Sequence, residues 1–330
     1  YGFVQKKKAN IILAKQKTEI ENTNEELNQI NEELSTTVDT VNQQKTEIEN
    51  TNEELNQINE ELSTTVDTVN QQKTEIENTH QKTYASINYA SRIQQALLPS
   101  KEIFSTFFSE HFILFKPKDI VSGDFYYLKK VNDFLVVAVV DCTGHGVPGA
   151  FVSLLGISFL NEIVVKKEVQ TAADILENLR HHVKTSLKQI KGDSQSKDGM
   201  DIALCVLDTK TNLLQFAGAY NPLCIIRNKE LIEIKGTRCP VGVHIKEKSF
   251  ENHEIQLQTT DSVYLFSDGY QDQFGGEKGM KFMAKKFKQL LLEISDQPFD
   301  KQKETLVSRF RTWKKARKQI DDVTVLGFKV

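Results

Sequence analysis

The sequence predicts an α+β layered domain that follows a long N-terminal helix with the features of a coiled coil. Two observations carry this prediction. The segment 17–44 recurs identically at 45–72, and its apolar residues fall seven positions apart. From about residue 101 the pattern changes to short apolar runs separated by turn residues, with helical patterns between groups of runs. Such grouping is typical of an α+β domain rather than of regular βαβ alternation.

The N-terminal repeat predicts a left-handed coiled coil, because a strict seven-residue apolar period maintains a seam between helices. The seam residues are Ile20, Leu27, Leu34, Val41, Ile48, Leu55, Leu62, Val69 and Ile76. The second seam is mostly polar, since Thr23 and Thr37 flank Ile30 in one of the two possible registers. We therefore expect residues 1–83 to form a parallel homodimeric stalk that either transmits a signal or serves as a passive spacer.

Residues 84–100 predict a further helix that leads into the globular part. The stretch YASINYASRIQQALL is densely apolar, and Pro99 ends it. No Gly/Ser-rich flexible segment separates stalk from domain, so a change in stalk geometry would reach the domain. We expect the globular domain to span residues 101–330.

The apolar runs of that domain predict its strands, and 3.6-residue periodicity predicts its helices. The expected strands lie at 112–115, 134–140, 202–207, 214–217, 223–226, 263–266 and 323–328. The expected helices lie at about 148–167, 171–190, 279–295 and 300–316.

The composition favours a reduced intracellular protein that does not bind nucleic acid. The 330 residues carry a formal net charge of −3, and the four cysteines form no CxxC pair. No apolar run reaches the length of a membrane span. Lys6–Lys8 is either a solvated charge run or a basic cluster on the cytoplasmic side of a membrane. We expect a cytoplasmic protein, or the cytoplasmic part of a membrane-anchored one whose sensor region lies outside this sequence.

Aspartates stand where predicted strands meet turns. Asp124 lies in SGDFYY, Asp141 ends FLVVAVVD, Asp268 ends VYLFSD, and Asp321 and Asp322 precede the last strand. A carboxylate at the end of a buried strand is costly without a partner, and its repetition indicates convergence on a cation. Carboxylate oxygens without a Cys/His set favour Mg²⁺ or Mn²⁺ over Zn²⁺.

Three other chemistries fit the neighbourhood of Asp141 poorly. The glycines of 144–149 match GxGxxG, but the preceding carboxylate would oppose a pyrophosphate and no second acidic strand end follows. A cysteine phosphatase would need an arginine six residues after Cys142, where Pro148 stands. Cys142 and His145 lack a second ligand pair for zinc.

Six segments together resemble the PPM/PP2C phosphatase superfamily, and within it the bacterial SpoIIE/RsbU-type branch. They are KPKDIVSGDFYYL, VVDCTGHGVPGAFVSLLG, DGMDIALCVLD, AGAYNPLCIIR, LFSDGYQDQFGG and DDVTVLGF. They occur in the family's order, and with INYASRIQQALLP the resemblance covers about residues 85–330.

The resemblance implies a PP2C-like β-sandwich flanked by helices, with two Mn²⁺ or Mg²⁺ ions at one end. It makes Asp141 the carboxylate that bridges both metals and the backbone carbonyl of Cys142 a further ligand. Asp268 and Asp321 are implied as ligands of the first metal, and Asp124 as one that acts through water. Metal-activated water would then attack the phosphate without a covalent phosphoenzyme.

The resemblance leaves other acidic residues in secondary roles. Asp322 matches a neighbour that is often Asn in relatives and is placed second. Asp198 and Asp201 lie in a segment that is near the site in relatives, and their roles stay open.

The implied function is a protein serine/threonine phosphatase in bacterial signalling, regulated through the dimeric coiled coil. Its substrate would be a phosphorylated partner protein, in this branch an anti-sigma-factor antagonist. His145 would shape the turn or protonate the serine leaving group. The substrate-binding arginine of eukaryotic relatives has no counterpart here, and Lys116 or Lys118 are the substitutes. The alternative is a pseudo-phosphatase that serves as a scaffold or docking module.

Overall fold

The computed structural model describes residues 2–166, 171–189 and 198–329. The chain divides into two compact units, with the division between Gln81 and Lys82. The helix α1 (Gly2–Leu97) makes up the first unit and continues into the second. The ends of the helices expected at 148–167 and 171–190 lie outside the described residues.

In the first unit, α1 leaves its apolar seam exposed. Leu27 and Leu55, which occupy the same position in the two repeats, are 51% and 52% exposed. Ion pairs between lysine and glutamate four residues apart recur once per repeat on this helix. An exposed apolar seam of this length is typical of a helix that packs against a partner helix.

The second unit is a β-sandwich flanked by helices, so the predicted fold class is confirmed. One sheet has the order β1-β12-β9-β6-β7 and the other β2-β3-β4-β5-β8, with neighbouring strands antiparallel. The first sheet comprises β1 (Glu110–Lys116), β12 (Val323–Lys329), β9 (Ser262–Phe266), β6 (Leu223–Arg227) and β7 (Glu230–Ile234). The second comprises β2 (Phe125–Val131), β3 (Phe134–Cys142), β4 (Met200–Asp208), β5 (Leu213–Ala219) and β8 (His253–Gln256).

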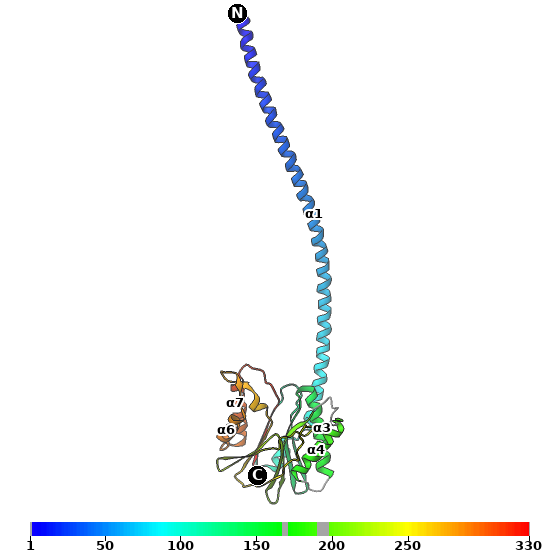
Figure 1. The fold of residues 1–330 in the computed structure, drawn as a ribbon, viewed down its shortest axis with the longest axis vertical. Coiled ribbons are helices and arrows are strands. Elements are labelled where there is room, and N and C mark those ends of the chain that lie inside the picture. Colours follow the sequence, from blue (N-terminus) through cyan, green and yellow to red (C-terminus); the bar gives the residue numbers. More distant parts are fainter. Residues whose placement is uncertain (1, 167–170, 190–197, 330) are drawn as a thin grey trace. The chain divides into compact units, whose positions relative to one another are not determined.

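Helices cover the outer faces of both sheets (Figure 1). The flanking helices are α3 (Gly146–Lys166), α4 (Ala172–Ser186), α6 (Ala284–Ile294) and α7 (Phe299–Lys314). The shorter elements are α2 (Lys101–Phe107), α5 (Gly269–Asp272), β10 (Phe274–Gly275) and β11 (Met280–Lys281). The short elements and β2, β7 and β8 were not expected. The edge strands β7 and β8 carry mixed polar and apolar residues without an apolar run.

Side chains that alternate along β3 explain why one face of its sheet packs against the other sheet and the opposite face packs against helices. Leu135, Val137 and Val139 face the core between the sheets. Val136 and Val140 face the core under α3 and α4. Because both faces of β3 are buried, the strand is a continuous apolar run, and the only charged side chain within it is Asp141 near its end.

The helix α3 corrects one expectation. Its stretch Gly146–Val165 is long and apolar enough to pass a test of length and composition for a membrane span, whereas the sequence was expected to contain none. Half of this stretch is buried in the domain, as the core helix of a layered domain would be.

Candidate functional site

The sandwich brings the predicted aspartates to one end. Asp141, near the end of β3, lies directly opposite Asp201 on β4. Asp268 follows β9 at the start of α5, and β9 pairs with β12, which Asp321 and Asp322 precede. These strand ends meet because the paired strands run antiparallel.

Asp124 is fixed in the interior by two hydroxyl groups. Its side chain is 1% exposed. One carboxylate oxygen, Oδ2, accepts hydrogen bonds from Ser267 Oγ at 2.6 Å and from Thr324 Oγ1 at 2.8 Å. The pKa of Asp124 is raised to about 8, because burial and the negative charges of Asp322 and Asp321 raise it more than the hydrogen bonds from Ser267 and Thr324 lower it.

Asp322 uses both carboxylate oxygens to hold the loop before Asp124. Lys118 N donates to Oδ1 and Gly123 N donates to Oδ2, each at 2.7 Å. The side chain is 2% exposed. Both carboxylate oxygens of Asp322 therefore accept a charge-assisted hydrogen bond from the backbone of the loop that leads to Asp124.

The remaining carboxylates raise one another's pKa. Burial and the charges of four other aspartates hold the pKa of Asp141 well above its usual range; the four are Asp124, Asp268, Asp321 and Asp201. Burial and the charge of Asp268 raise the pKa of Asp201 to about 7. Burial, then Asp272 and Asp321, raise the pKa of Asp268 to about 6. Mutual repulsion of this kind marks a place where positive charge is missing.

A divalent cation fits this donor set. The largest charges that act on Asp141 are those of aspartates, and all are negative. Lysines offset part of the repulsion at two neighbouring carboxylates: Lys281 lowers the pKa of Asp268, and Lys118 lowers the pKa of Asp321. Carboxylate oxygens are the ligands that Mg²⁺ and Mn²⁺ prefer. Within 2–166, 171–189 and 198–329, no three His, Cys, Asp or Glu side chains are already arranged to hold a metal ion.

The turn after β3 packs closely against the loop that carries Asp124. A Cβ atom at Gly123 would collide with the carbonyl oxygen of Gly144 and would lie 3.2 Å from that of Cys142. Gly144 itself has φ +84°, which favours glycine. The Cys142 side chain is a buried free thiol that belongs to the core under α3 and α4.

A histidine–aspartate pair stands beside this turn. His145 Nδ1 lies 2.9 Å from Asp119 Oδ2, and both side chains are about half exposed. The charge of His145 lowers the pKa of Asp321, so the imidazole lies within electrostatic reach of that carboxylate. Asp119 was not predicted as a site residue, although it lies in the KPKDIVSGD motif.

The other predicted residues lie at the edges of the site. Lys118 faces Asp321, whereas Lys116 contributes a backbone carbonyl that accepts from Gln319 Nε2 at 2.8 Å. The carbonyl of Asp198 accepts from Gln189, and the next residue, Gly199, forms backbone bonds with Thr143 in the turn.

The C-terminal end of α1 holds the loop before Asp124. Gln94 is 3% exposed; its Nε2 donates to Ser122 O at 2.6 Å, and its Oε1 accepts from Ser122 N at 3.0 Å. Three residues earlier, Ser91 Oγ donates to Ile120 O at 2.9 Å. One helix turn therefore fixes the backbone next to Gly123 and Asp124.

Comparison with known proteins identifies the family. The family described as Stage II sporulation protein E (SpoIIE) matches residues 132–330. The chain belongs to the SpoIIE family. Among solved structures, the SiaA-PP2C domain of Pseudomonas aeruginosa is similar, with 33% identity and a TM-score of 0.70, over 76% of this chain and 98% of that one. The second unit of this SpoIIE-family chain is a PP2C-type protein-serine/threonine phosphatase domain.

Two more distant structures share the fold. The PP2C phosphatase domain with a regulatory fragment of SpoIIE from Bacillus subtilis has 18% identity and a TM-score of 0.54, over 67% of this chain and 61% of that one. The RsbU and RsbW domains of Rv1364c from Mycobacterium tuberculosis have 19% identity and a TM-score of 0.53, over 67% of this chain and 60% of that one. No curated protein matches the sequence.

Proposed function

We propose that this chain is a divalent-metal-dependent phosphatase that removes phosphate from phosphoserine or phosphothreonine on a partner protein. The observation that carries the proposal is the uncompensated negative charge around Asp141, where four other aspartates act on one partly buried carboxylate. In a signalling pathway of the SpoIIE type the partner would be a phosphorylated anti-sigma-factor antagonist.

The carboxylates of Asp141, Asp268 and Asp321, with the carbonyl of Cys142, would hold two Mg²⁺ or Mn²⁺ ions. Asp124 would act through water, and Asp201 would add a further negative charge opposite Asp141. When bound, the ions would supply charge neutralisation for the transition state and activation of the attacking water. Lys118, whose charge lowers the pKa of Asp321, would attract the phosphate.

His145 would act as the general acid. Asp119 accepts the Nδ1–H bond, so it would stabilise the imidazolium and leave Nε2–H to protonate the serine oxygen as the P–O bond breaks. The neutral imidazole would keep its Nδ1 proton. The pairing with Asp119 favours this role over a purely structural one, because the turn conformation already follows from Gly144 and Gly146.

The stalk would regulate this site as a parallel homodimer. The exposed apolar seam of α1 and the grip of Ser91 and Gln94 on the loop before Asp124 support the proposal. A change in stalk geometry would reach that loop through one continuous helix. We place the domain in the cytoplasm, with Lys6–Lys8 near a membrane if the protein is anchored.

The test is hydrolysis of a phosphoserine peptide by the full chain with Mn²⁺, with Mg²⁺ and with a chelator. Release of phosphate that requires the cation supports the proposal. Equal release in the presence of chelator refutes metal dependence, and no release with any cation or phosphopeptide would favour a scaffold.

A further inference from the structure

A second cationic feature lies on α4, away from the aspartates. Arg180 is 6% exposed, and its Cζ lies 3.9 Å from the centroid of the Phe250 ring. Its Nη1 donates to Lys248 O at 2.9 Å and to Glu177 Oε2 at 3.2 Å. One edge of the guanidinium is therefore well held by the protein.

The other edge of Arg180 makes no hydrogen bond to any of the described residues. Its Nε and Nη2 atoms are buried, and no hydrogen-bond partner for either is found in the part of the chain that the structure describes. The same two atoms of Arg227 hold the Asp261 carboxylate, with Nε to Oδ1 at 2.9 Å and Nη2 to Oδ2 at 2.6 Å. In Arg227 this pair of donor atoms, called the fork below, binds the two oxygens of a carboxylate in one plane. Arg180 has the same fork, and no group occupies it among the described residues.

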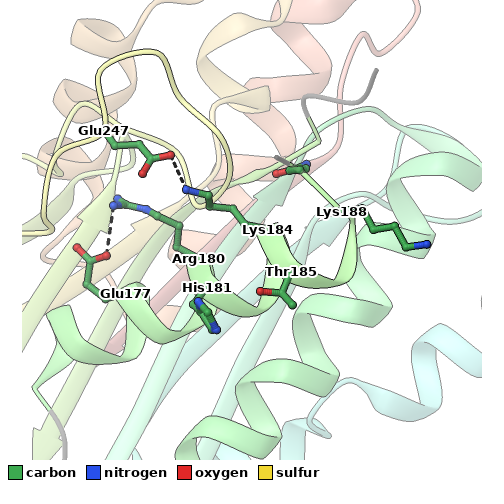
Figure 2. Close-up of a pocket in the computed structure, with 8 residues that line it drawn as sticks. Glu177, Arg180, His181, Lys184, Thr185, Lys188 and Glu247 are labelled. Carbon is green, nitrogen blue, oxygen red and sulfur yellow. Dashed lines mark hydrogen bonds and ion pairs between the residues drawn. The ribbon is translucent and has the colours of Figure 1, made fainter. Parts of the chain in front are cut away.

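Arg180 is one of the residues that line a groove of about 610 Å³ between α4 and the loop that carries Glu247. Figure 2 shows Arg180 and Lys184 on successive turns of α4, and Lys188 on the chain just after the helix ends. Gln189 lines the same groove, is 3% exposed, and its Oε1 is buried without a partner among the described residues. Two buried side chains in one groove therefore keep unused hydrogen-bonding capacity.

The acidic residues of the groove are already engaged. Glu177 Oε1 accepts from Phe250 N at 2.9 Å, and its Oε2 faces Arg180 Nη1. Glu247 Oε1 pairs with Lys184 Nζ at 2.6 Å across the groove. An incoming anion would compete with Glu247 for Lys184 and would also bind the Nε–Nη2 edge of Arg180.

We propose that this groove is a second oxyanion site, separate from the aspartate cluster, in which the Nε–Nη2 edge of Arg180 binds a phosphate or carboxylate group and Lys184 supplies further positive charge. The proposal is independent of the phosphatase reaction, because none of these residues belongs to the candidate active site.

The test measures ligand-induced stabilisation of the full chain without added divalent metal. Sodium phosphate and sodium acetate are titrated in separate arms, against sodium chloride at matched ionic strength, and the thermal midpoint is followed. The variants are Arg180→Lys, which keeps the charge and removes the fork, and Glu247→Gln, which removes the competing carboxylate. Lys210→Gln, a surface change at Asp133, is the control.

We expect saturable stabilisation by phosphate, acetate or both beyond that of chloride; the responding arm identifies the ligand class. The apparent affinity should fall about tenfold or more in Arg180→Lys, rise in Glu247→Gln, and stay unchanged in the control. No effect beyond chloride, or equal affinity in the wild type and Arg180→Lys, overturns the proposal. If Arg180→Lys does not fold, unchanged affinity in Glu247→Gln overturns it instead.

Discussion

Asp322 accepts the backbone N–H of Gly123 at 2.7 Å, although 199 positions separate the two residues. The same carboxylate accepts Lys118 N with its other oxygen. The loop that presents Asp124 is therefore tied to the start of the last strand. Neighbouring aspartates 321 and 322 consequently have different tasks, since only the second has both oxygens committed to backbone groups.

This difference predicts opposite phenotypes for two adjacent substitutions. Asp322→Asn replaces one acceptor oxygen by a donor and should lower the free energy of unfolding by about 1–3 kcal/mol. Asp321→Asn should abolish most activity with a smaller effect on stability. Urea unfolding and initial rates on both variants check this, and equal stability of Asp322→Asn and the wild type would contradict the positioning role.

The pair of His145 and Asp119 predicts a dependence on the leaving group. A serine alkoxide needs a proton as it departs, whereas p-nitrophenolate does not. Asp119→Asn and His145→Gln should therefore slow phosphoserine-peptide hydrolysis by about 100-fold and change p-nitrophenyl phosphate hydrolysis much less. A merely structural role would reduce both rates together, and that result would rule out the general acid.

The grip of Gln94 on Ser122 predicts that the end of α1 controls the loop. Gln94→Ala leaves the N–H and C=O groups of Ser122 without their partner and should cost about 1–3 kcal/mol of stability. It should also reduce activity. The matched control is Gln95→Ala, because Gln95 is exposed and makes only a 3.4 Å contact with Ser91. Identical activity of the two variants would argue against control by this helix.

The exposed seam of α1 predicts a dimer that substitutions at a few apolar seam residues should disrupt. Changing Leu34 and Leu62 together to Asp should convert the chain to a monomer in sedimentation equilibrium, because charges would enter the apolar seam. Glu32→Ala with Glu60→Ala, off the seam, should leave the dimer intact. A monomeric wild type with full activity would exclude regulation through the stalk.

The sequence predicts those parts of the site that depend on local pattern. Asp141 and Asp268 could be found because each closes an apolar strand, and the seven-residue period identified the seam of α1. The strand β7 was missed because its apolar residues are interrupted: only Leu231 and Ile232 stand together, between Glu230 and Glu233.

Residues whose roles depend on distant partners could not be predicted. Asp119 matters through His145, Gln94 through Ser122, and Asp322 through backbone groups about 200 positions earlier. Local sequence does not specify these contacts, since the packing of the two sheets creates them. The unpaired fork of Arg180 is likewise visible only once its burial is known.

The central claim is that the carboxylate of Asp141 holds the catalytic cation. The most direct measurement is the rate of phosphate release from a phosphoserine peptide across a Mn²⁺ titration, for the wild type, Asp141→Asn and Asp133→Asn. Asp133 lies next to the opposite end of β3 and pairs with Lys210. We predict a saturable, metal-dependent rate that Asp133→Asn retains and that Asp141→Asn reduces at least about 100-fold. A rate in Asp141→Asn equal to that of the wild type, with the same dependence on Mn²⁺, would contradict the account.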